Sequence, residues 1–124
     1  MSRITSFRDL LVWQKAMALA QRCYAVCQQM PKQEQMVLGH QIRKSAVSIP
    51  SNIAEGHARH HTAVYVHHLW MAHGSGAELE TQLELSMRVK VVSEQDATAL
   101  ISDAQEIGRM IHGLVKSLER PTPS

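Results

Sequence analysis

Apolar residues recur at alternating intervals of three and four along nearly the whole chain. The pattern is clearest near the C-terminus, where the repeated positions are Leu100, Ala104, Ile107, Ile111, Leu114 and Leu118. Residues three and four apart lie on one face of an α-helix, whereas a half-buried strand would alternate every second residue. The spacing therefore predicts an all-α protein whose amphipathic helices bury their apolar faces against one another.

The same spacing, interrupted by sparse Gly and Pro, predicts four helices over about residues 7–29, 33–56, 62–90 and 94–119. Ser6 with Asp9, Thr62, and Ser93 with Asp96 are the candidate N-caps. All three connections are short, so neighbouring helices should be antiparallel. The chain of 124 residues is expected to form one domain, 1–124, an up-down-up-down four-helix bundle with a frayed tail at 120–124.

The second predicted helix is the unusual one. Gly56 is expected to stop it, and Pro50 lies inside it, where the missing N–H should kink or break the helix. Beside its apolar stripe runs a polar one, which predicts a hydrogen-bonded seam inside the bundle or, alternatively, a subunit or ligand contact. Counting from the turns places Arg43 near Ser75 and Glu78, Trp13 opposite Pro50, and Gly76 near Gly108. The predicted structural polar network consists of Gln41, Arg43, Ser48, Asn52, Glu55 and Glu78.

Composition fits a helical, reduced, non-membrane protein. Aromatic residues make up only 4% of the chain, so the core must be aliphatic. Cys23 and Cys27 lie four apart in a helical pattern, where side chains pair poorly as a disulfide, and we expect free thiols. No stretch approaches the ~20 apolar residues of a membrane span, and no signal-like start is present. The expected location is the cytoplasm, with no membrane partner.

The sequence offers no convincing catalytic or metal site. Of the eight histidines, His60 and His67 are seven residues apart, as are His61 and His68, a separation of about 10 Å along a helix axis. Such pairs share a face but not one metal ion, so solvated histidines that gain charge below pH ~6.5 are the better interpretation. No nucleophile motif has its required strand-turn-helix context. We expect no enzyme activity, no cofactor and no bound metal.

Charge is distributed unevenly between the two halves of the chain. Residues 1–60 carry eight Lys or Arg against three acids, a net +5, and since the whole chain is +2 the remainder is −3. The asymmetry predicts either a basic face for a polyanion or charge pairing between the halves or between subunits. For a nucleic acid, the candidate phosphate contacts are Lys15, Arg22, Lys44 and Arg59.

Three segments of the chain resemble a known bacterial family. They are Phe7-Arg8-Asp9-Leu10 with Val12-Trp13-Gln14-Lys15-Ala16, the run from Gln41 through Ser48-Ile49-Pro50-Ser51-Asn52-Ile53-Ala54-Glu55-Gly56, and Gly74-Ser75 with Glu78-Leu79-Glu80-Thr81-Gln82-Leu83. The chain is similar to the four-helix bundle proteins encoded by intervening sequences of large-subunit ribosomal RNA genes. His73, Val64 and Val91-Val92 depart from the pattern of that family.

The resemblance implies a bundle whose second helix continues through the Pro, and a ring-like homopentamer. A related branch, the accessory proteins of diversity-generating retroelements, binds nucleic acid and a reverse transcriptase through a basic surface. Two hypotheses result. In the first, the chain is an oligomeric module that binds RNA or DNA through a basic surface with low sequence specificity. In the second, it is a protein-interaction scaffold with no nucleic-acid role.

Overall fold

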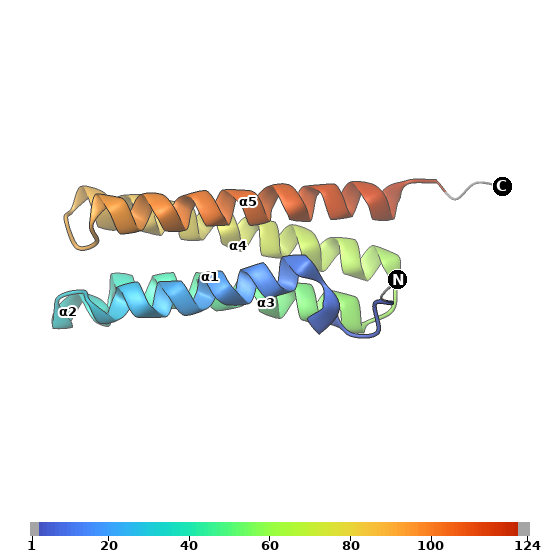
Figure 1. The fold of residues 1–124 in the computed structure, drawn as a ribbon, viewed down its shortest axis with the longest axis horizontal. Helices are drawn as coiled ribbons and strands as arrows, with labels where there is room; N and C mark the ends of the chain where they lie inside the picture. Colours follow the sequence, from blue (N-terminus) through green and yellow to red (C-terminus); the bar gives the residue numbers. More distant parts are fainter. Residues whose placement is uncertain (1–2, 122–124) are drawn as a thin grey trace.

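A computed structural model describes residues 3–121 and contains four long helices side by side (Figure 1). They are α1 (Leu11–Gln28), α3 (Leu38–Ala58), α4 (Thr62–Arg88) and α5 (Glu94–Glu119). The short η1 (Phe7–Asp9) precedes α1, and the short α2 (Lys32–Gln35) lies between α1 and α3. Successive long helices run in opposite directions (Figure 1). Contacts join α1 to α3, α3 to α4, α4 to α5 and α1 to α5, which closes the bundle. The all-α four-helix prediction is confirmed.

One aliphatic core fills the centre of the bundle, as the spacing predicted. Each long helix contributes residues at intervals of three and four; the largest fully buried aliphatic side chains are Leu19, Ile42, Ile49, Ile53, Leu69, Leu79, Leu83, Leu100, Ile111 and Val115. Cys23 and Cys27 are free and buried in the same core. Burial raises the pKa of Cys23 to about 12 and also raises the pKa of Cys27, so neither thiol has the thiolate character that reactivity needs.

The predicted start of the first helix was wrong. Ser6 and Asp9 do form a capping box, but it closes only the 3-10 turn η1, and Leu10 is extended with φ −76° and ψ 125°. The Asp9 carboxylate accepts hydrogen bonds from the backbone of Thr5 and Ser6 at 2.9 and 3.1 Å, and the bond from Thr5 is the main cause of its lowered pKa. The turn is held by these local hydrogen bonds and by an edge-to-face contact between the rings of Phe7 and Trp13, whose centroids are 5.3 Å apart. The continuous helix therefore begins only at Leu11.

The second predicted helix is divided in two. The short α2 ends before Val37, whose φ of −107° and ψ of −87° are not helical, and α3 begins at Leu38. Arg43 donates to the backbone carbonyl of Gln35 at 3.0 Å and so satisfies an oxygen that a continuous helix would have used. From there α3 passes through Pro50 without breaking and ends at Ala58.

Gly56 lies within α3 and does not stop the helix, in contrast to the prediction. A Cβ placed on Gly56 would lie 2.7 Å from Cβ of His68 and 3.2 Å from Cδ1 of Tyr65 on α4. The glycine is thus needed because α3 and α4 approach closely here. The left-handed residue that ends this region is His60, with φ 54°.

The later helix ends match the prediction more closely. His61, not Thr62, is the N-cap of α4, with Nδ1 accepting weakly from the Val64 N–H at 3.5 Å. Ser93 caps α5 as predicted, with Oγ accepting from the Asp96 N–H at 3.1 Å. The predicted tail at 120–124 falls mostly outside the described residues.

Two glycine substitutions should separate close packing from helix propensity. Gly56→Ala should lower the free energy of unfolding by about 1–3 kcal/mol, since the new methyl group overlaps α4. Gly74→Ala, whose Cβ would meet nothing within 4 Å, should raise it by about 0.5–1 kcal/mol. Urea denaturation of both variants measures the difference. Equal effects of the two changes would contradict the proposed close approach of α3 and α4.

Candidate nucleic-acid interface

The bundle consists of two helix pairs with opposite charge. The pair α1 and α3 carries Lys15, Arg22, Arg43 and Lys44 against one acid, Glu55, for a net +3. The pair α4 and α5 carries three cations (Arg88, Arg109 and Lys116) against eight acids, for a net −5; the acids are Glu78, Glu80, Glu84, Glu94, Asp96, Asp103, Glu106 and Glu119. The asymmetry along the sequence therefore becomes a separation of charge across the bundle.

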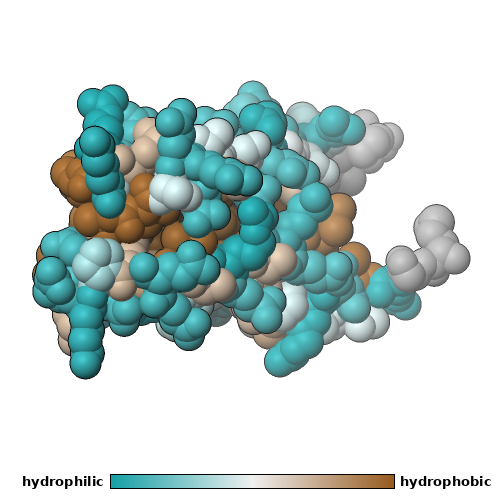
Figure 2. Space-filling model, turned by 60° about the vertical axis from the view of Figure 1, so that its left-hand side comes forward, coloured by the Kyte–Doolittle hydropathy of each residue, from teal (hydrophilic) through white to brown (hydrophobic). Residues whose placement is uncertain are grey.

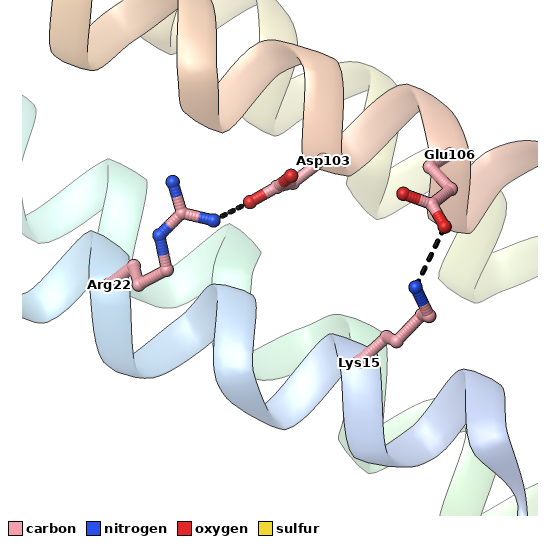
Figure 3. Close-up of polar contacts among 4 residues, drawn as sticks. All are labelled: Lys15, Arg22, Asp103 and Glu106. Carbon is pink, nitrogen blue, oxygen red and sulfur yellow. Dashed lines mark hydrogen bonds and ion pairs between the residues drawn. The ribbon is translucent and has the colours of Figure 1, made fainter.

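Two of the four candidate phosphate contacts form ion pairs that join these layers. Lys15 Nζ lies 2.8 Å from Glu106 Oε1, and Arg22 pairs with Asp103, so both pairs bridge α1 and α5 (Figure 3). The Lys15 and Arg22 side chains remain 40% and 50% exposed. Exposed pairs are worth about 0–1 kcal/mol and are screened by salt, so a polyanion can compete for these cations. Both cations of α1 are nonetheless already paired with acids of α5 in the same chain.

The other two candidates lie on or beside α3. Lys44 is exposed and forms no ion pair with any residue between 3 and 121. Arg59 follows α3 and pairs with Glu55 through Nη2 and Oε1 at 3.1 Å, an exposed contact between residues four apart. All four cations are thus available at the surface, and Lys44 is the one that a phosphate could engage without breaking an existing pair.

Part of the predicted polar network forms a chain of hydrogen bonds between α3 and α4. Ser48 Oγ and Ser75 Oγ are 2.7 Å apart, and Asn52 Nδ2 donates to the backbone oxygen of Ser48 at 3.0 Å and to its Oγ at 3.1 Å. Asn52 Oδ1 in turn lies 3.1 Å from Nδ1 of His68. His68 and Ser75 extend the network onto α4, one through its ring and the other through its hydroxyl.

The remaining residues predicted for this network lie elsewhere. Gln41, Glu55 and Glu78 are exposed and take no part in the chain of bonds. Arg43, which counting from the turns had placed near Glu78, forms no ion pair with residues between 3 and 121. Its guanidinium donates instead to the Gln35 carbonyl. Residues near α2 could not be placed from helical spacing, since the break at Val37 shifts their register.

An apolar groove lies between α1 and α3, on the basic side of the bundle. Its volume is about 640 Å³, and its lining includes Trp13, Met17, Tyr24, Val47 and Pro50. Tyr24 remains 46% exposed, although it continues the apolar spacing of α1. The Arg43 guanidinium lies 5.9 Å from the Tyr24 ring centroid. The groove thus presents aromatic rings, with a cation beside one of them, which sequence spacing alone did not reveal.

The expected contact of Trp13 with the region of Pro50 is consistent with their shared position in this groove. The sequence held a sign of this groove, because α1 carries two parallel apolar seams and only part of that wide face is buried in the core.

Neither a membrane span nor a metal centre is found among residues 3–121. None of their helices combines the length and apolarity needed to cross a bilayer. Their His, Cys, Asp and Glu side chains nowhere gather in groups of three or more that could hold a metal ion.

Comparisons with known proteins agree on the fold. The sequence matches the family described as 23S rRNA-intervening sequence protein over residues 8–113. The structure is similar to a crystal structure from Bacteroides thetaiotaomicron, described as a protein of unknown function from the S23 ribosomal protein family, with a TM-score of 0.80 and 25% identity. That match covers 86% of this chain and 99% of the other. No curated protein matches the chain.

The hydrogen-bond chain predicts which polar residues stabilise the bundle. Asn52→Ala should lower the free energy of unfolding by about 1–3 kcal/mol, because it leaves Nδ1 of His68 without its partner and removes one of the bonds to Ser48 Oγ. Gln41→Ala, at an exposed position on the same helix, should change it by less than about 0.5 kcal/mol. Chemical denaturation of the two variants tests the assignment, and a cost at Gln41 as large as that at Asn52 would refute it.

The ion pair between Lys15 and Glu106 predicts a pH dependence of stability. The hydrogen bond and the charge of Lys15 hold the pKa of Glu106 below its ordinary value of 4.5. The stabilisation that ionised Glu106 adds to the folded state is therefore fully present above pH 4.5 and is lost as the pH falls through the lower pKa of Glu106 in the folded protein. Lys15→Ala should thus be less stable than the parent protein near neutral pH and should converge with it in strong acid. Unfolding curves recorded across this pH range measure the effect. Lys90→Ala is the control, because its difference in stability from the parent protein should not change with pH in this range.

Proposed function

Since this chain belongs to the 23S rRNA-intervening sequence protein family, we propose that it is a non-enzymatic cytoplasmic module that binds RNA, or DNA, through the basic face of α1 and α3. The observation that carries the proposal is the charge separation between the two helix pairs, +3 on α1 and α3 against −5 on α4 and α5. The field of the protein favours a polyanion on the first pair over the second and so orients the complex.

The binding face suits phosphate contacts better than base readout. Lys15, Arg22 and Lys44 present flexible cations at the surface of two neighbouring helices. No recognition helix of a known groove-reading type is evident in the sequence. Contacts with phosphates position a protein on a nucleic acid without reading its sequence, so affinity should depend strongly on salt and weakly on sequence.

Self-association belongs to the same proposal. The family resemblance implies a homopentamer, and a ring of identical chains would repeat the basic face of α1 and α3 around its circumference. Repeated weak sites on one particle bind a long polyanion much more tightly than a single site does. A native mass measurement with and without a short RNA counts the subunits and detects the complex in the same experiment.

A protein-interaction scaffold is the second candidate function, and exposed apolar surface favours it. The groove between α1 and α3 is lined largely by apolar side chains. Hydrophobic side chains also gather at the end of the bundle away from the chain termini (Figure 2), where Met36, Val37 and Val89 are exposed. Contiguous exposed apolar patches commonly mark protein contacts. In this alternative the protein binds a partner protein and has no affinity for RNA or DNA.

Salt dependence and one charge reversal test the proposed function. The logarithm of the affinity for a short RNA should fall linearly with the logarithm of the salt concentration, because phosphate contacts release counterions. Lys44→Glu should weaken binding and reduce the magnitude of that slope by about one per bound subunit. Fluorescence anisotropy of a labelled oligonucleotide, recorded over a range of salt concentrations, provides both values.

Lys90→Glu is the matched control, since it makes the same charge change at an exposed residue between α4 and α5. It should leave the slope unchanged. An affinity that does not respond to salt, or equal effects of the two reversals, would remove the basis for the proposed interface.

A further inference from the structure

The opposite edge of the bundle holds a second groove, between α4 and α5, with a different chemistry. Its volume is about 740 Å³. Three of its rings form a cluster: Trp70 lies 5.5 Å from His73 and 5.8 Å from His112, measured between ring centroids. Trp70 remains 41% exposed, so part of the indole surface is open to the groove. Such a surface favours a flat ligand that can stack.

Polar groups stand at the same groove. Gln105 Nε2 donates to Glu80 Oε1 at 3.2 Å, which fixes the carboxylate of α4 against the amide of α5. The second carboxylate oxygen of Glu80 has no hydrogen-bond partner among residues 3–121. Arg109 also lines the groove, is exposed, and forms no ion pair in the described part of the chain. The groove therefore combines a stacking surface, an acceptor held in place and an unused cation.

Small residues widen the space next to this groove. Gly76 lies on α4 between Trp70 and Glu80, and a Cβ built on it would meet nothing within 4 Å. With Gly108 it lines a narrow crevice that adjoins the groove at His73 and Glu80. The expected close approach of α4 and α5 at Gly76 and Gly108 therefore does not explain why a glycine stands at position 76. Gly76 thus leaves open space beside the groove that a side chain would otherwise fill.

We propose that this groove binds one guanine nucleotide of a single-stranded RNA. The base stacks on Trp70, Glu80 accepts hydrogen bonds from the N1–H and N2–H donors on its Watson–Crick edge, and Arg109 contacts a phosphate. A carboxylate suits guanine because that edge presents two adjacent donors, whereas adenine presents only one. The occupant is a single nucleotide, because the net charge of −5 on α4 and α5 disfavours a longer phosphate track.

A nucleotide fits this groove better than a protein side chain does. Protein contacts are usually built around a densely packed apolar centre, whereas five residues of the lining are charged or can form hydrogen bonds through polar side chains: His73, Glu80, Gln105, Arg109 and His112. The inference rests on the proposed RNA function for its biological source of nucleotides. Its structural basis is independent, because no residue of α1 or α3 lines the groove.

Fluorescence quenching with a mononucleotide tests the site directly. The chain has two tryptophans, so Trp13→Phe leaves Trp70 as the only indole. Guanosine 5′-monophosphate should quench the Trp70 fluorescence of this variant saturably, with a Kd about tenfold lower than that of adenosine 5′-monophosphate. Glu80→Gln in the same background should remove that preference. Absence of saturable quenching by either nucleotide overturns the proposal.

RNA-binding measurements on variants distinguish this site from the basic face of α1 and α3. Trp70→Ala should weaken binding of a G-containing single-stranded RNA by about tenfold and leave the salt slope unchanged, whereas Lys44→Glu changes the slope. Met71→Ala is the matched control, since Met71 is the next residue and is 45% exposed; it should have no effect. Circular dichroism of each variant confirms that the helices are intact.

The outcomes distinguish the two proposals. If Lys44→Glu alters RNA binding and Trp70→Ala does not, the groove proposal is overturned and the proposed function stands. If the mononucleotide binds at Trp70 but no RNA binds at any salt concentration, the proposed function fails, and the groove proposal is overturned for RNA, since the groove then binds free nucleotides only. If Trp70→Ala changes only the subunit number in a native mass measurement, the groove is a protein contact and the nucleotide proposal is overturned.

Discussion

The close contact between α3 and α4 is the constraint on which the rest of the bundle depends. At Gly56 the two helices are near enough that a single methyl group would overlap His68. Only with this spacing can the hydroxyls of Ser48 and Ser75 reach each other across the helix pair. Small residues thus set the distance, and a short chain of hydrogen bonds fixes the register. A partly buried polar network whose groups bond to one another favours one arrangement of the two helices.

The outer helices are joined to this pair in a different way. Where α1 meets α5, exposed ion pairs bridge the two helices above the core (Figure 3). Such pairs contribute little free energy, yet they bring cations of the basic layer beside acids of the other layer. The surfaces between α1 and α3 and between α4 and α5 each carry an open groove. The protein therefore offers two chemically distinct surfaces, one apolar and basic, the other aromatic and hydrogen-bonding.

The interior of this member of the 23S rRNA-intervening sequence protein family offers little for binding. The core is aliphatic and closed, its thiols are held protonated by burial, and the polar residues between α3 and α4 bond mainly to one another. What remains for binding is the exterior. Trp70 illustrates the point: its neighbours in space, His73 and His112, come from two helices that meet only in the folded protein.

The sequence by itself determined the helical class, the four long helices and most of the core, because apolar spacing and helix periodicity are local properties of the chain. It also identified Ser93 as a cap and placed Ser48 and Asn52 in a polar seam. Tertiary structure alone decided the rest. The role of Gly56 depends on how near α4 lies. The Gln35 carbonyl at the end of α2 is satisfied by the side chain of Arg43, eight residues further on, and the exposure of Tyr24 depends on how α1 packs beside α3. The engagement of Lys15 and Arg22 depends on acids about 80 to 90 residues away in the sequence. Periodicity specifies which face of a helix is apolar, but the distance between helices and the identity of facing residues arise only when all four pack together.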